Sequence, residues 1–141
     1  TPKTSLGAWV KEQEDTCYIC NFYKDTYARY LDTFFELFKK SQEFLPLFET
    51  CKGFCIPHFG DLVETAESAL SDKEKKAFYA ILFPMMEQNM QRLSDDLDWF
   101  CDKFDYRNKD ADWRTSKDAL PRGMQKAAGG YPADEPYTMD K

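Results

Sequence analysis

Apolar residues recur at intervals of three and four along most of the chain, which is the pattern of amphipathic helices. Thr4 or Ser5 can cap a short helix that runs to about residue 13. A longer helix is predicted over residues 17–40, with acidic residues before its start and Lys39 and Lys40 at its end. Its apolar face would carry Tyr23, Tyr27, Tyr30, Leu31, Phe34, Leu37 and Phe38.

The middle of the chain predicts two shorter helices. Residues 41–50 indicate a short helical segment interrupted by Pro46, and Gly53 is expected as its left-handed cap. Pro57 is suited to the first turn of the next helix. The apolar residues of that helix are Phe59, Leu62, Val63, Ala66 and Leu70.

The longest predicted helix follows. Ser71 and Glu74 have the spacing of a capping box, so this helix should begin at Asp72 and run to about residue 105, with a kink near Pro84. Its second half has a regular seam of apolar residues that would pack against another helix, internally or in a second copy. The seam consists of Met86, Met90, Leu93, Leu97, Phe100 and Phe104.

A last helix is expected over residues 118–128, with Pro121 in its first turn and Gly129 after its end. No segment alternates in the manner of a strand. The sequence therefore predicts an all-α fold, a small bundle of about five to six helices with one long kinked helix. We expect one helical metal-binding domain over residues 1–130 and an extended or disordered tail over residues 131–141.

Charge and hydropathy each disfavour one class of partner. The formal charge is −6, from 25 acidic and 19 basic residues, which disfavours nucleic-acid binding. Basic residues between Lys103 and Lys126 alternate with Asp, so they should form a solvated surface, as should Asp95, Asp96 and Asp98. The sequence shows no apolar run long enough to span a membrane and no export signal, so a cytoplasmic location is expected.

Two pairs of residues carry the candidate chemistry. Cys17 and Cys20 form a C-x-x-C motif, while Cys55 and His58, the single histidine, form a C-x-x-H motif. Zinc prefers four tetrahedral sulfur and imidazole ligands, and residues two apart suit one edge of that tetrahedron. Both pairs fall near predicted helix starts, where free N–H groups favour thiolates. The four residues therefore predict one Cys₃His site that staples the bundle, with structural zinc as the metal and iron as the runner-up.

The two remaining cysteines are weaker candidates. Cys51 lies four residues before Cys55 and could replace one ligand or lie close to the metal without binding it. Cys101 is expected to be a buried free thiol beside the seam.

Five segments, residues 4–9, 17–21, 53–59, 103–108 and 116–122, together resemble an uncharacterised bacterial family of unknown function. The resemblance spans nearly the whole chain. It implies that relatives are longer and contain an N-terminal half with its own C-x-x-C and Gly-Phe-Cys-x-x-His motifs. This chain would then correspond to the C-terminal half of a protein with two similar metal-binding units. The resemblance implies no activity, and no cysteine is expected at the position of Cys51.

Three functions fit these observations. The first is a structural zinc-binding domain for protein interaction or regulation, whose partner would be the N-terminal half or a second copy. The second is a redox switch in which Cys17 and Cys20 oxidise and release the metal. The third is an enzyme with Cys55 as nucleophile, His58 as base and Asp61 orienting the imidazole, but this conflicts with a ligand role for His58.

Overall fold

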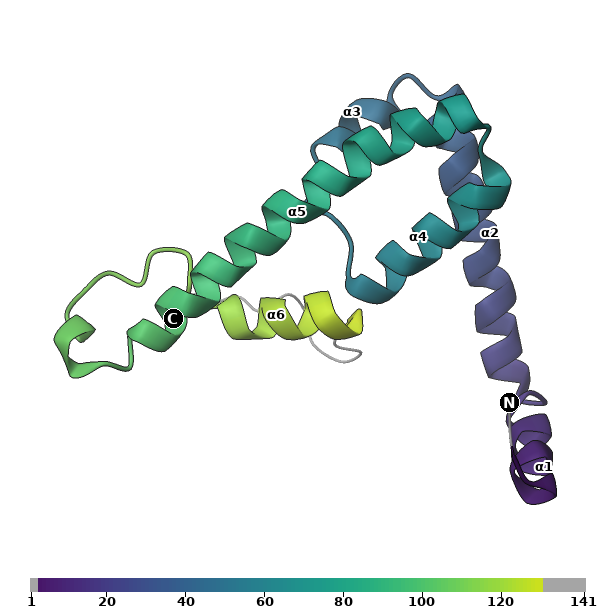
Figure 1. Cartoon of the computed structure of the whole chain (residues 1–141), viewed down its shortest axis with the longest axis horizontal. Helices are drawn as coiled ribbons and strands as arrows, with labels where there is room; N and C mark the ends of the chain where they lie inside the picture. The colour runs from purple at the N-terminus through teal and green to yellow at the C-terminus, as the bar shows by residue number, and fades with distance from the viewer. Residues whose placement is uncertain (1–2, 131–141) are drawn as a thin grey trace. The chain divides into compact units, whose positions relative to one another are not determined.

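The computed structural model describes residues 3–130, and its regular elements there are all helical (Figure 1). Six α-helices and one short 3₁₀ helix follow one another, and no strand occurs in the described range. The all-α prediction is therefore confirmed. The predicted C-terminal tail, residues 131–141, lies outside the described residues.

The chain divides into two compact units, residues 1–41 and 42–141. The first contains α1 (Ser5–Glu14) and α2 (Tyr18–Lys40). Thr4 is the N-cap of α1, and its hydroxyl accepts a hydrogen bond from the Gly7 N–H at 3.1 Å. Both predicted helices are thus confirmed almost to the residue. The prediction that residues 1–130 form one domain stays a prediction.

Half of the aromatic side chains of α2 are exposed. Phe35 is its one buried residue, whereas Tyr23 and Tyr30 on the predicted apolar face are 64% and 69% exposed. Tyr23 stacks on Tyr27 with ring centroids 6.3 Å apart. The helical period was therefore predicted correctly, but it did not identify which residues are buried.

The second unit contains α3 (Phe44–Glu49), α4 (Ile56–Ala69), α5 (Asp72–Asp102), the 3₁₀ helix η1 (Tyr106–Asn108) and α6 (Ala119–Ala128). Helices α3 and α6 pack beside different parts of the long α5, and α4 also contacts α6 (Figure 1). Pro46 lies within α3 and does not interrupt it. Pro84 likewise lies inside α5 without ending it.

The core of the second unit is built around stacked aromatic rings. Phe48 of α3 and Phe78 of α5 are buried, with ring centroids 5.5 Å apart and planes nearly parallel. Five other buried side chains, aliphatic or sulfur-containing, also remove apolar surface from water. These are Leu62, Ala66, Leu82, Met85 and Met86.

The start of α5 matches its predicted capping box. The Glu74 carboxylate accepts hydrogen bonds from the Ser71 N–H at 2.8 Å and the Ser71 hydroxyl at 2.6 Å, which satisfies donors that the helix itself leaves open. Helix α5 begins at Asp72, as predicted, and ends three residues earlier than expected, at Asp102.

The seam of α5 is only partly buried. Met86 and Leu93 are buried, and Leu97 faces α6, where a Cβ added to Gly123 would lie 3.5 Å from it. Met90 and Phe104, at 38% and 74% exposed, lie outside this contact. The internal packing of the seam is therefore confirmed at Leu97.

No helix in residues 3–130 is long and apolar enough to cross a membrane.

Candidate functional site

The first predicted ligand pair lies at the beginning of α2. Cys17 is the N-cap residue and Cys20 lies in the first turn, so both thiols lie at the positive end of a helix of 23 residues. Both side chains are exposed, and neither forms a disulfide. The backbone N–H groups of Ile19 and Cys20 act on the Cys17 sulfur and favour its thiolate form.

The two thiols of this pair interact directly. A hydrogen bond from the Cys20 backbone N–H, followed by one from the Cys20 side chain, lowers the pKa of Cys17. The same side-chain bond, in which Cys20 donates, raises the pKa of Cys20, together with the negative charge of Cys17. Cys17 is therefore the thiol of the pair that ionises first.

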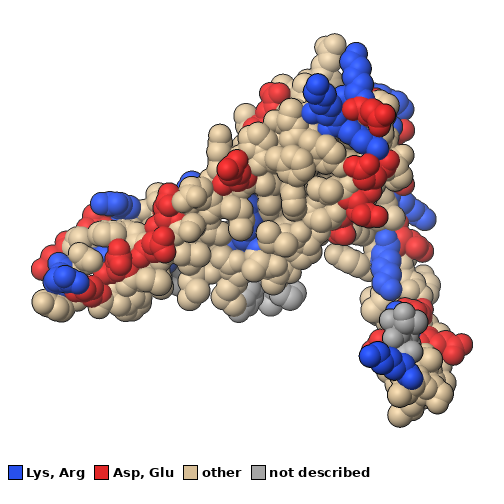
Figure 2. Space-filling model, in the orientation of Figure 1, with Lys and Arg blue, Asp and Glu red and all other residues tan. Residues whose placement is uncertain are grey.

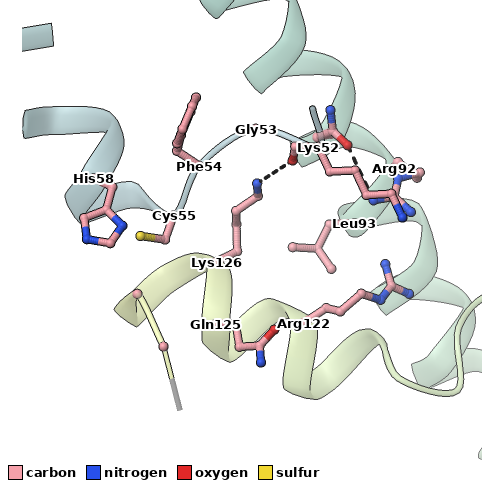
Figure 3. A pocket seen from close by; sticks show the side chains of 13 residues that line it. Lys52, Gly53, Phe54, Cys55, His58, Arg92, Leu93, Arg122, Gln125 and Lys126 are labelled. Carbon is pink, nitrogen blue, oxygen red and sulfur yellow. Dashed lines mark hydrogen bonds between the residues drawn. The ribbon is translucent and has the colours of Figure 1, made fainter. Parts of the chain in front are cut away.

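The second pair occupies the same position on another helix. Cys55 is the N-cap residue of α4, Pro57 lies in the first turn, and His58 follows it. The Cys55 side chain makes no capping hydrogen bond. Its sulfur points toward the His58 ring (Figure 3). Cys55 is half-buried because the end of α6 lies close to it, and a Cβ on Gly129 would be 3.6 Å from Cys55 Sγ.

The two pairs belong to different units, with Cys17 and Cys20 in residues 1–41 and Cys55 and His58 in residues 42–141. Within residues 3–130 the structure places no group of three or more His, Cys, Asp or Glu side chains so as to hold a metal ion. The sequence expectation that both pairs lie at helix starts is confirmed. The Cys₃His centre built from them stays a prediction.

The other cysteines differ in environment. Cys51 is half-buried in the second unit, and its sulfur lies 3.1 Å from Met85 Sδ, so it packs against the core. Cys101 is exposed on α5. The expectation of a buried thiol at Cys101 is therefore wrong.

A cavity of about 500 Å³ lies where the start of α4 meets α5 and α6 (Figure 3). Cys55 and His58 contribute to its lining. None of its described lining residues is Asp or Glu, although several are cationic or amide side chains. These polar residues are Lys52, Asn89, Arg92, Arg122, Gln125 and Lys126.

Lys126 and Gly53 hold one wall of this cavity. The Lys126 ammonium donates to the Lys52 carbonyl at 3.0 Å, which joins α6 to the loop before α4. Burial lowers the pKa of Lys126, while the nearby thiols of Cys51 and Cys55 act in the opposite direction. Gly53 has φ +70°, which confirms the predicted left-handed conformation.

Arg122 lines a second wall of this cavity and forms an ion pair with Asp96, which is not a lining residue. Its Nη2 lies 2.9 Å from Asp96 Oδ2 and 2.9 Å from Asp118 Oδ1, and it donates to the Thr115 carbonyl at 2.6 Å. Burial acts to raise the pKa of Asp96, but hydrogen bonds from Thr115 and Arg122 outweigh it, so the pKa of Asp96 is lowered.

Two charge predictions are corrected by these contacts. Asp96 is 8% exposed and Lys103 is 7% exposed, so neither belongs to a solvated surface. Asp96 pairs with Arg122, 26 residues further on, and Lys103 donates to backbone carbonyls five to eight residues further on, and local charge alternation reveals neither. Asp95 and Asp98 are exposed as expected, and Figure 2 shows acidic side chains along the C-terminal part of α5.

Comparison with known proteins places the chain without assigning it an activity. No curated protein and no solved structure shows significant similarity to it. A family model matches residues 1–134, nearly the whole chain. The chain therefore belongs to DUF6062, a family of unknown function.

Proposed function

We propose that Cys17, Cys20, Cys55 and His58 bind one structural zinc ion. The observation that supports this most is that the first cysteine of each pair is the N-cap residue of a helix. Free N–H groups and the positive helix end stabilise thiolate, the form of cysteine that binds metal. Two unrelated segments thus present their ligands in the same way.

Zinc fits this ligand set better than other metals. Three thiolates and one imidazole fill a tetrahedral site and leave no open position, which is typical of structural zinc. Iron is the second choice, since thiolates also hold iron, but a histidine ligand is less common in clusters. The site would carry a net charge of −1, which the helix N-termini would offset.

The proposed role is structural, in a domain for protein interaction or regulation. A metal held by ligands far apart in sequence contributes to the free energy of folding, since the unfolded chain does not contain the site. The resemblance suggests a partner of the same kind, either an N-terminal half with its own ligand pairs or a second copy of this chain.

Thermal melting tests the structural role. Purified protein melted with and without a strong zinc chelator should show a sharply lower Tm in chelator. The variant Cys101→Ser removes an exposed thiol outside both pairs. Chelator should lower its Tm by as much as it lowers the Tm of the wild type. An unchanged Tm in chelator would reject the structural role.

A thiol switch is the second candidate, favoured by the exposed and mutually hydrogen-bonded thiols of Cys17 and Cys20. Peroxide would oxidise both thiols to one disulfide and be reduced to two waters, and any bound metal would leave. Mass spectrometry after mild peroxide should then show a Cys17–Cys20 disulfide before Cys101 oxidises. Retained metal with all thiols reduced would speak against a switch.

A further inference from the structure

The cavity beside α4 combines size, charge and open hydrogen-bond donors. Its volume of about 500 Å³ lies within the usual range of small-molecule sites. Four cationic side chains line it, Lys52, Arg92, Arg122 and Lys126, with no carboxylate among the described lining residues. Such a concentration of positive charge is notable in a chain whose formal charge is −6.

Three of these cations form no ion pair in the part of the chain that the structure describes. Within residues 3–130, no Asp or Glu forms an ion pair with Lys52, Arg92 or Lys126; the ion pairs involve other basic residues. Lys126 is held in place by its bond to the Lys52 carbonyl, and Arg92 Nη2 lies 3.5 Å from Asn89 Oδ1. The charge of Arg92 also acts on Asp96, whereas Lys52 and Lys126 have no such carboxylate neighbour among the described ion pairs, so the cavity keeps positive charge for a ligand.

Arg122 offers N–H donors to a ligand rather than net charge, because its charge is balanced by Asp96 and Asp118. Its Nη2 is occupied by Asp96, Asp118 and the Thr115 carbonyl. Its Nε and Nη1 are buried and have no hydrogen-bond partner in the part of the chain that the structure describes. Buried donors in proteins are nearly always satisfied, so these two N–H groups call for an acceptor. The ion pairs of Nη2 hold the guanidinium in one orientation, in which Nε and Nη1 can donate to such an acceptor.

We propose that this cavity binds a small multivalent oxyanion, with Lys52, Arg92 and Lys126 supplying charge and Arg122 supplying donors. Guanidinium and ammonium groups bind phosphate and carboxylate oxygens through charge-assisted hydrogen bonds. Asn89 and Gln125 line the same cavity and can bind polar groups of the ligand. The proposal does not depend on zinc, because none of these residues is a proposed metal ligand.

Calorimetric titration of the full chain tests the site, with inorganic phosphate and succinate as the two probes. Ionic strength is held constant with chloride, since salt screens weak charge interactions. Saturable binding of either probe supports an oxyanion site, and the preferred probe identifies phosphate or carboxylate as the ligand group. Absence of saturable binding for both probes would overturn the proposal.

Substitutions distinguish specific binding in this cavity from nonspecific attraction of anions to positive charge. Arg92→Gln and Lys126→Gln should each weaken binding of the preferred probe about tenfold, by loss of a charge-assisted hydrogen bond. The matched control is Lys76→Gln, on an exposed part of α5 outside the cavity, which should change binding less than about twofold. Equal weakening by Lys76→Gln and Arg92→Gln would refute the site.

A last variant separates this proposal from the metal proposal. His58→Ala should keep oxyanion binding, because the cations on α5 and α6 remain. Loss of binding in folded His58→Ala protein would show that the anion depends on His58 or on a metal there, which would overturn the assignment to the cationic wall. Circular dichroism of each variant confirms that it is folded.

Discussion

Gly53 is the residue at which backbone conformation and packing both require glycine. Its φ is +70°, and an added Cβ would lie 2.9 Å from Met86 Sδ and 3.3 Å from Lys126 Nζ. The Phe54 N–H also donates to Met86 Sδ at 3.2 Å, so the loop is fixed against α5. Gly53→Ala should therefore lower the free energy of unfolding by about 2 kcal/mol, measured by urea denaturation.

Gly60 provides the matched control for this substitution. It lies inside α4, and no atom comes within 4 Å of a Cβ built there. Gly60→Ala should raise the free energy of unfolding by about 0.5–1 kcal/mol, because alanine has the higher helix propensity. Similar effects of the two alanines would contradict the described conformation of Gly53.

Asp96 links α5 to α6 through a charge pair that depends on pH. Its hydrogen bonds to Thr115 (2.6 Å) and Arg122 (2.9 Å) lower its pKa in the folded state. A lowered folded-state pKa means that the stabilisation is present above the unfolded pKa, about 3.9, and is lost as the pH falls. Asp96→Asn should lower the free energy of unfolding by about 2 kcal/mol at neutral pH.

The difference between wild type and Asp96→Asn should shrink as the pH falls below about 4, because the unfolded wild-type chain then binds a proton that folded Asp96, with its lowered pKa, takes up only at lower pH. Urea denaturation at a series of pH values measures this. Asp98→Asn, at an exposed position two residues away, should leave stability nearly unchanged at every pH. A pH-independent deficit in Asp96→Asn would argue against a charged Asp96 in the folded protein.

At the scale of elements, Lys103 organises the segment between α5 and α6. Its ammonium donates to the carbonyls of Asn108 (2.6 Å), Lys109 (3.0 Å) and Ala111 (2.5 Å). It also lies 5.2 Å from the centroid of the Trp113 ring. One buried side chain thus satisfies three backbone acceptors of a segment with little regular structure.

Lys103→Met should loosen this segment while leaving the helices in place. Methionine keeps most of the stem but donates no hydrogen bond, so amides in residues 104–116 should exchange their hydrogens at least about tenfold faster. Hydrogen exchange followed by mass spectrometry measures this. Lys117→Met, at an exposed site in the same segment, is the control. Unchanged protection in Lys103→Met would exclude the proposed role of Lys103.

At the scale of the whole molecule, local signals predicted the helices well. Thr4, Ser71 with Glu74, and Gly129 mark helix ends through chemistry confined to a few neighbouring residues, and the structure confirms each. Gly53 is left-handed as predicted, but it does not cap α3, whose C-cap is Thr50. The short η1 helix was not predicted, because only Asp105, which accepts from the Arg107 N–H, marks its start.

Side-chain environments were predicted less well, since they depend on partners distant in sequence. Asp96 and Lys103 look like solvated charges until Arg122 and the carbonyls of residues 108–111 surround them. The cationic cavity likewise needs the loop before α4, α5 and α6 together. Both ligand pairs were correctly expected at helix starts, but assembly of four ligands depends on contacts beyond either helix.

Elemental analysis of the purified chain tests the central claim most directly. The wild type should contain one zinc per chain, and Cys17→Ser and His58→Ala, one from each pair, should each lose most of it. Cys101→Ser should retain full zinc content. A folded wild-type preparation that contains neither zinc nor iron would contradict the proposed metal site. So would retention of the metal by both variants.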